Sequence, residues 1–369
     1  MLNELLIPLR DYFGFLNLFE YITFRAGASA ILALLISFIF GPFIVRKLIN
    51  LQIGESIRDH GPDSHKEKQG TPTMGGVLII LSTIIPTILL ADLDNMFIQI
   101  VCLSMVWMGI VGFYDDYLKV VKKRKDGLSG RYKLLAQTIL GIFISYLLIS
   151  SNIYGDYTLS TFVPFLKNVS INFFYPIIYA LFVILVVAAT SNAVNLTDGL
   201  DGLASGLLAI SVSVFGVIAY ISGRVDFTDY LYIAYLPLAS ELTIFATAFF
   251  GGCLGFLWFN AKPAEIFMGD VGSLSTGAAL GTLAILLKKE VLLLIVGGVF
   301  VIETLSVIIQ VLYFRFTKKK YGEGKKFFLM APIHHHFELK GWPESRVVTR
   351  FWIIGILFAL MSLTTFKVR

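Results

Sequence analysis

Long apolar runs separated by short polar segments recur along the whole chain. A helix that crosses a bilayer needs about 20 mostly apolar residues. The pattern therefore predicts ten membrane-spanning helices, the second, third and eighth of them short, at 24–45, 74–91, 97–114, 134–151, 173–190, 203–222, 236–257, 271–287, 291–314 and 349–366. Gly and Pro inside several runs fit this prediction, because membrane helices tolerate both.

Composition supports a membrane protein. The chain has 369 residues, of which 56% are hydrophobic and only 15% charged, whereas a soluble domain carries roughly 25% charged residues. Cys102 and Cys253 lie inside apolar runs and are best read as small buried hydrophobes. We expect one all-α polytopic domain over residues 1–369, embedded in a lipid bilayer, with no second domain and no nucleic-acid partner.

The distribution of basic residues predicts the orientation. Cytoplasmic loops collect Lys and Arg, and the segments that follow odd-numbered spans hold 22 of the 30 basic residues. These loops are therefore expected in the cytoplasm and both termini on the outer, periplasmic side. Lys288 and Lys289 run against this rule, but one short hairpin does not overturn it.

Unusual polar residues gather in four clusters, each after an odd-numbered span. If the orientation is right, all four share the cytoplasmic face and can form one site. The clusters are Tyr114–Tyr117, Asn192–Gly202, Asn260 with Phe267–Asp270, and Pro332–Glu338.

Asp115 and Asp116 are adjacent carboxylates, which repel each other unless a cation or a proton-transfer role uses them. One can bind a hard cation while the other accepts a proton. The alternative is a solvated helix end beside Lys119.

The segment 192–202 combines two Asn, two Asp and two Gly without a basic residue. Asp198 and Asp201 would share a face in a helical turn, and glycines allow a ligand close to the backbone. This predicts a cation or polar-ligand site, and the alternative is a capped helix start at Thr197 or Asp198.

Asp270 follows an aromatic residue, Phe267, just before a span. The carboxylate can hold Mg²⁺ and the ring can stack on a base. An N-cap for the eighth helix is an equally simple interpretation of Asp270.

The histidines His334, His335 and His336 are consecutive and lack the usual spacing of zinc ligands. Anion binding, or bracing of their loop, fits them better. Lys68 precedes Thr73 and a pair of glycines at a helix start, which suits phosphate, although an ordinary basic loop explains the same residues.

Together the clusters offer carboxylates for Mg²⁺, amides and an aromatic ring for a nucleobase, and lysines for phosphates. Mg²⁺ usually takes one or two carboxylates plus substrate phosphates. The combination predicts phosphoryl transfer from a nucleotide-activated donor to an acceptor in the membrane, with positioning and charge neutralisation supplying most of the catalysis.

The motifs also carry a family resemblance that runs nearly end to end. The chain resembles the phospho-N-acetylmuramoyl-pentapeptide-transferases of the polyprenyl-phosphate N-acetylhexosamine-1-phosphate transferase superfamily. The aspartate motifs are typical of the superfamily and the histidine motif of the muramoyl-pentapeptide branch. The matching segments are Tyr21–Arg25, Thr71–Gly76, Asp115–Tyr117, Asn192–Gly202, Phe267–Ser273 and Ala331–His336.

The resemblance implies transfer of phospho-N-acetylmuramoyl-pentapeptide from its UDP carrier to undecaprenyl phosphate. The products would be lipid I and UMP, made for the cell wall at the inner membrane. It further implies a Mg²⁺-dependent homodimer that nucleoside antibiotics inhibit at the uridine pocket.

The resemblance also assigns roles to residues. Asp270 would be the Mg²⁺ ligand, with Asp116 a second candidate near metal or lipid, and Asp115 the base. The uridine pocket would be lined by Asn195, Asp198, Asp201, Asn260 and Phe267, and the phosphates faced by Lys68, Thr73, Lys119 and Lys133. The three histidines would contact the larger donor.

Two other functions compete. A sibling enzyme would transfer GlcNAc-1-phosphate, which the histidine motif argues against. A transporter would place polar groups near the midplane, whereas most acids here lie at span ends. Glu303, in the middle of the ninth span, is the exception, and we expect a hydrogen-bonded structural carboxyl. Direct attack by the lipid phosphate is favoured over an acyl-phosphate intermediate, which stays an alternative.

Overall fold

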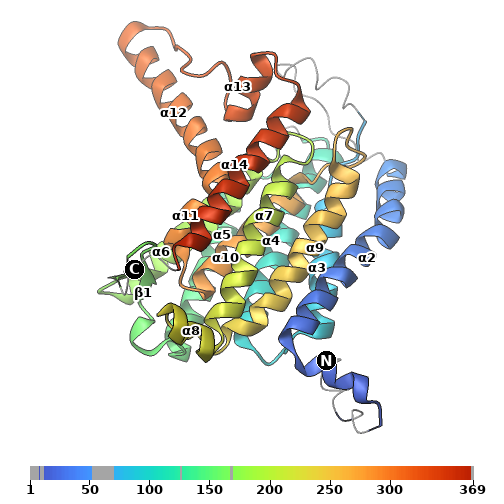
Figure 1. Cartoon of the computed structure of the whole chain (residues 1–369). Coiled ribbons are helices and arrows are strands. Elements are labelled where there is room, and N and C mark those ends of the chain that lie inside the picture. Colours follow the sequence, from blue (N-terminus) through green and yellow to red (C-terminus); the bar gives the residue numbers. More distant parts are fainter. Residues whose placement is uncertain (1–7, 9–11, 52–69, 125–126, 167–168, 367–369) are drawn as a thin grey trace.

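The computed structural model describes residues 8, 12–51, 70–124, 127–166 and 169–366 (Figure 1). Eight of the described helices are long and apolar enough to cross a membrane. They are α2 (Ile22–Asn50), α4 (Met96–Val120), α5 (Gly130–Ser151), α6 (Pro176–Thr197), α7 (Leu203–Ser222), α9 (Leu242–Asn260), α12 (Gly298–Tyr321) and α14 (Glu344–Thr364). The prediction of an all-α polytopic membrane protein is confirmed.

The two other expected spans are the helices α3 (Gly76–Leu90) and α10 (Gly269–Leu286). All side chains of α10 from Val271 to Leu286 are buried, and the helix packs against α3, α4 and α6. Because protein surrounds it, α10 needs little lipophilic surface. It is rich in Gly, Ala, Ser and Thr, which let neighbouring helices approach closely.

The short elements complete the chain. They are η2 (Gly14–Glu20), η4 (Gly155–Tyr157), β1 (Ser160–Phe162), β2 (Ser170–Asn172), α8 (Val225–Leu231), η5 (Ala239–Glu241), α11 (Glu290–Val296) and α13 (Ile333–Leu339). The two strands pair antiparallel, with Ser160 opposite Asn172.

Two boundary predictions differ from the structure in ways that matter. The ninth span, expected unbroken over 291–314, divides at Gly297 into α11 and α12, and α12 then leans away from the other helices (Figure 1). The third and fifth spans continue as α4 to Val120 and as α6 to Thr197. The first polar residues of both clusters are therefore helical and not in loops.

The basic hairpin that breaks the charge rule has a structural explanation. The Lys288 side chain is fully buried, with its Nζ 4.4 Å from the ring centroids of both Tyr154 and Tyr179. It donates to the carbonyl oxygen of Thr158 at 2.7 Å. Burial lowers the pKa of Lys288 to about 8, against the opposing pull of the Glu290 carboxylate. Lys288 therefore joins the α10–α11 turn to the segment before β1.

Helix α2 begins and α14 ends at the same end of the molecule (Figure 1). This agrees with termini on one side of a membrane. Which side faces the cytoplasm stays a prediction.

Candidate functional site

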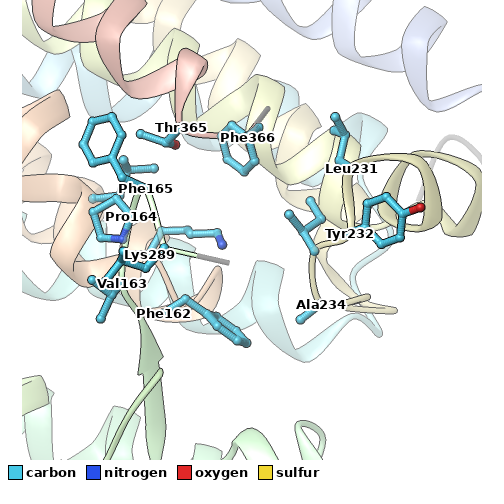
Figure 2. A pocket seen from close by; sticks show the side chains of 13 residues that line it. Phe162, Val163, Pro164, Phe165, Leu231, Tyr232, Ala234, Lys289, Thr365 and Phe366 are labelled. Carbon is cyan, nitrogen blue, oxygen red and sulfur yellow. The ribbon is translucent and has the colours of Figure 1, made fainter. Parts of the chain in front are cut away.

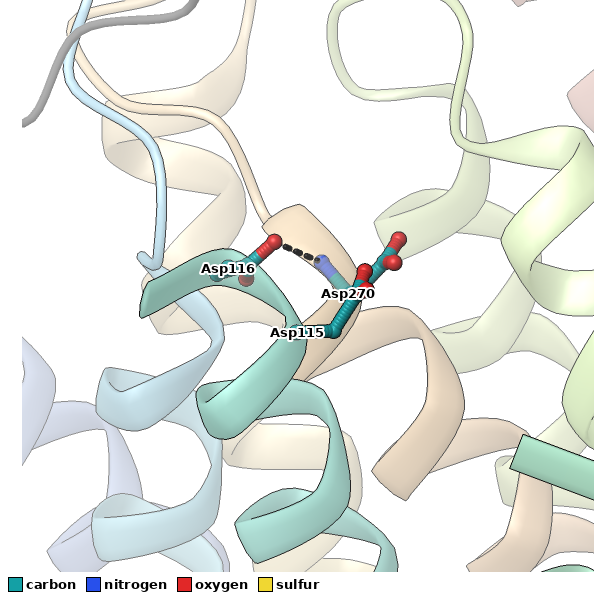
Figure 3. A group of neighbouring side chains, drawn as sticks. All are labelled: Asp115, Asp116 and Asp270. Atoms are coloured by element: carbon teal, nitrogen blue, oxygen red, sulfur yellow. Dashed lines mark hydrogen bonds between the residues drawn. The ribbon is translucent and has the colours of Figure 1, made fainter. Parts of the chain in front are cut away.

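Three carboxylates from two helices meet at one point. Asp115 and Asp116 lie in the last turns of α4, and Asp270 lies in the first turn of α10 (Figure 3). Each offers an oxygen, and these oxygens all lie within 4.8 Å of one another. Asp115 and Asp116 are 0% and 3% exposed, so the interpretation of a solvated helix end is wrong.

Two glycines allow the helices to meet this closely. A Cβ atom on Gly112 of α4 would lie 2.2 Å from the carbonyl oxygen of Asp270. A Cβ atom on Gly76 of α3 would overlap Gly272 of α10. Larger residues at these positions would push the first turn of α10, and Asp270 with it, away from α4.

Asp116 holds the start of α10. Its oxygens accept hydrogen bonds from the backbone N–H groups of Asp270, at 3.2 Å, and Val271, at 3.0 Å. A helix N-terminus has unpaired N–H groups and a partial positive charge, which a carboxylate satisfies. The alternative role of Asp270 as N-cap is wrong: the N-cap residue is Met268, without a side-chain cap, and the carboxylate comes from α4.

Two lysines bridge the other carboxylates. Nζ of Lys119 lies 2.6 Å from Oδ2 of Asp115 and 2.8 Å from Oδ2 of Asp270. Nζ of Lys133, from α5, lies 2.9 Å and 2.6 Å from the same oxygens. The Lys119 side chain is 36% exposed and that of Lys133 17%. The site therefore contains two lysine cations, and both are partly exposed to solvent.

Asn195 orients Asp270 from α6. Its Nδ2 donates to Oδ1 of Asp270 at 2.6 Å and contacts Oγ of Ser273 at 2.8 Å. Ser273 in turn donates to the carbonyl oxygen of Gly269. Sequence reasoning gave Ser273 no role. The available signal was that Ser273 lies one helical turn after Gly269, within reach of its carbonyl oxygen.

The segment before α3 is joined to the α9–α10 loop. The backbone N–H of Phe267 donates to Pro72, and the carbonyl oxygen of Phe267 accepts from Gly75, both at 2.8 Å. Thr73 is buried beside this junction, and Phe267 is half-buried. Lys68 lies outside the described residues.

Asp198 and Asp201 lie in the turn between α6 and α7, outside both helices. Neither Thr197 nor Asp198 caps α7, whose N-cap is Gly202. Oδ2 of Asp201 accepts the backbone N–H of Ala264 at 3.3 Å. Asp201 therefore also connects this turn to the α9–α10 loop.

Asn260 and Glu344 extend this connection. Oδ1 of Asn260 accepts from the backbone N–H of Gly202 at 3.0 Å. Glu344 lies at the start of α14, and its Oε1 accepts a hydrogen bond from the backbone N–H of Asp201 at 2.8 Å. Its Oε2 accepts a hydrogen bond from Nζ of Lys262 at 2.7 Å. Sequence reasoning missed Glu344, because its partner is a backbone amide distant in the chain.

The three histidines belong to α13, and each has a different neighbour. Nδ1 of His334 lies 3.1 Å from Oε2 of Glu303. Nδ1 of His335 lies 2.8 Å from Oε2 of Glu338. Nδ1 of His336 accepts the backbone N–H of Leu329 at 3.1 Å. Burial, and then the charge of Lys340, lower the pKa of His336.

A pocket lies away from the acidic cluster, beside β1 and the end of α14. Its lining includes Phe162, Leu231 and Phe366, and the amine of Lys289 points into it (Figure 2). Helix α5 runs between the two regions, with the acidic cluster near its start and β1 beyond its end. The converging charged groups make the three carboxylates the stronger candidate for a reactive site.

The donor set fits a divalent cation. Carboxylate oxygens are the ligands that hard cations such as Mg²⁺ prefer. Asp115 and Asp270 each present an oxygen toward Lys119 and Lys133, whereas both oxygens of Asp116 accept backbone amides. Asp270 and Asp115 are the best placed to hold the ion.

Two patterns of known protein families match this chain. The pattern of Glycosyl transferase family 4 matches residues 98–288, which include all three aspartates. Signature 1 of the phospho-N-acetylmuramoyl-pentapeptide-transferases matches residues 68–80. Together with the apolar helices, these matches show that the chain is a membrane-embedded transferase.

Curated relatives narrow the class. Proteins named phospho-N-acetylmuramoyl-pentapeptide-transferase from Desulfosudis oleivorans, Desulforapulum autotrophicum and Rickettsia felis are 49%, 50% and 50% identical to this chain, and each alignment covers 100% of both sequences. The chain belongs to the phospho-N-acetylmuramoyl-pentapeptide-transferase family.

Proposed function

We propose that the chain transfers phospho-N-acetylmuramoyl-pentapeptide from UDP-MurNAc-pentapeptide to undecaprenyl phosphate. The products are lipid I and UMP, used in peptidoglycan synthesis. The observation that carries the proposal is the meeting of Asp115, Asp116 and Asp270 with Lys119 and Lys133, in a chain with full-length relatives of that name.

In this proposal the carboxylates and the lysines have different roles. Asp270 and Asp115 hold Mg²⁺, and Asn195 and Asp116 keep Asp270 in place from two sides. When bound, the ion neutralises negative charge on the substrate phosphates. Lys119 and Lys133 exchange carboxylate oxygens for phosphate oxygens and offset the remaining charge.

Asp115 also accepts the proton of the lipid phosphate, which then attacks the β-phosphorus of the donor directly. The new P–O bond forms as the bond to the UMP oxygen breaks, and UMP leaves with the electron pair. A pyrophosphate-linked lipid results. Direct attack is favoured because a bound phosphate is already a competent nucleophile.

The donor's uridine is proposed to lie between the α6–α7 turn and Phe267. Asp198, Asp201 and Asn260 supply hydrogen-bonding groups there and the Phe267 ring stacks on uracil, while Thr73 and Lys68 face the phosphates. The histidines of α13 contact the lactyl-peptide portion. Nucleoside antibiotics would occupy the same uridine pocket, and the working unit would be a homodimer in the inner membrane.

The decisive experiment measures UMP release by the purified protein with UDP-MurNAc-pentapeptide and Mg²⁺, with and without a polyprenyl phosphate. Release that requires the lipid phosphate is expected. Equal release from UDP-GlcNAc would favour the sibling GlcNAc-1-phosphate transferase, and release without lipid would contradict transfer altogether.

A further inference from the structure

Glu303 and His334 form a buried pair that the proposed reaction does not use. Glu303 lies in α12 and His334 in α13, and both side chains are 0% exposed. Oε2 of Glu303 lies 3.1 Å from Nδ1 of His334. At that distance the carboxylate and the imidazole are within reach of a hydrogen bond.

The alignment of this pair is incomplete. Both carboxylate oxygens of Glu303 and both ring nitrogens of His334 lack a geometrically aligned hydrogen bond within the described part of the chain. Buried polar atoms in folded proteins are nearly always paired, so four orphaned atoms at one point call for an explanation. Glu303 was expected to be a hydrogen-bonded structural carboxyl, but its side-chain hydrogen bonds are not formed within the described residues.

The far edge of the imidazole faces the proposed donor site. A Cβ atom on Gly199 would lie 2.3 Å from Nε2 of His334. Gly199 directly follows Asp198 in the α6–α7 turn. Only a residue without a side chain leaves room for the ring in this position.

We propose that Glu303 is a positioning residue, which acts through His334 to hold the α6–α7 turn in its donor-binding arrangement. Its carboxylate selects the imidazole form with a proton on Nδ1, and so fixes the ring with Nε2 against Gly199. The proposal rests on the donor-binding role of the turn proposed above.

The second histidine strengthens the link to the donor. The rings of His334 and His335 pack edge to face with their centroids 4.1 Å apart, and His335 pairs with Glu338. Moving His334 therefore also moves His335, a proposed contact of the lactyl-peptide. Loss of Glu303 should therefore raise KM for the donor more than it lowers kcat.

Glu303→Gln keeps the shape and removes the charge. It should raise KM for UDP-MurNAc-pentapeptide about tenfold, the scale of one hydrogen bond to a charged group, with a smaller change in kcat. Gly199→Ala should act similarly, because its methyl group displaces the imidazole. The double variant should be little worse than either single variant, since both act through His334. Independent, multiplying effects would overturn the proposal.

Glu290→Gln is the matched control. Glu290 is also a buried carboxylate, 3% exposed, but it lies near β1 and bonds to Oγ1 of Thr161. Its loss should lower the melting temperature without changing KM for the donor. A rise in KM equal to that of Glu303→Gln would mean that any buried charge change has this effect, which would refute a specific role.

The pairing of Glu303 with His334 can also be tested by NMR spectroscopy, without measuring transferase activity. Nitrogen chemical shifts of ¹⁵N-labelled histidine distinguish the two imidazole tautomers and the charged ring, and a His334→Gln spectrum assigns the His334 signal. Glu303→Gln should shift that signal and leave His336 unchanged. An unshifted His334 signal would overturn the pairing even if turnover fell. A shifted signal in a protein without transferase activity would sustain the pairing and refute the proposed function.

Discussion

Asp116 of α4 accepts the backbone N–H of Asp270 of α10 at 3.2 Å. One carboxylate therefore holds the helix terminus that presents another carboxylate. The two aspartates make different contacts although they converge: Asp116 accepts backbone amides of α10, and the oxygens of Asp270 face Lys119, Lys133 and Asn195. The same bond explains how residues 154 positions apart in the chain are held in one geometry.

Asp116→Ala should destabilise the protein by about 1 kcal/mol, the usual effect of losing a helix cap. Asp116→Asn keeps one acceptor oxygen and should therefore lose less stability than Asp116→Ala. Thermal unfolding of the two variants in detergent measures the difference. Equal stability of wild type and Asp116→Ala would contradict the capping role.

Asp270→Asn should reduce turnover by roughly a thousandfold, because charge neutralisation by a bound metal supplies several kcal/mol. Binding of Mn²⁺, followed by electron paramagnetic resonance, tests the ion site without turnover. The variant should fold, since Asn keeps the size of the side chain and an acceptor for Asn195. Normal Mn²⁺ affinity in the folded variant would remove Asp270 from the metal site.

Asp115→Asn should slow turnover mainly at low pH. There the lipid phosphate carries a proton that a base must accept, whereas at high pH it is already a dianion. The profile of kcat against pH distinguishes this role from others. Uniform loss at every pH would assign Asp115 to metal binding alone.

Gly112→Ala should destabilise the protein by about 1–3 kcal/mol, as overpacking of a tight contact does, because the new methyl group meets the Asp270 carbonyl. Turnover should fall as well, since Asp270 is displaced. Gly27→Ala in α2 is the control: a Cβ atom there meets nothing within 4 Å, and Ala favours a helix by about 1 kcal/mol. Similar melting temperatures for the two variants would refute close packing at Gly112.

His336 should make stability depend on pH. Its pKa is lowered from 6.5, chiefly by burial, so the folded state favours the neutral ring that accepts the N–H of Leu329. The contribution is fully present above about pH 6.5 and is lost as pH falls through the lower folded value. His336→Asn, which keeps an acceptor, should flatten the acid side of a melting-temperature profile. An unchanged profile would place the acid sensitivity elsewhere.

Much of the architecture was predictable from residue pattern. Hydrophobic runs located the helices, because a bilayer demands about 20 apolar residues wherever a helix crosses it. The same pattern could not place the break at Gly297, since apolar residues continue on both sides of it. The count of basic residues in the loops predicted that Asp115 and Asp270 lie on the same face of the membrane. Their proximity in the structure agrees with this prediction.

Residue pattern alone was enough to predict the reactive groups, the helical fold and the family. The contacts that each of these groups makes became visible only in the folded protein. Folding made Asp116 a helix cap, turned Asn195 toward Asp270, and placed His334 between Glu303 and Gly199. These contacts could not be predicted because they join distant parts of the chain. A local pattern reports which atoms a residue carries, whereas packing of one helix against another selects the atoms that meet.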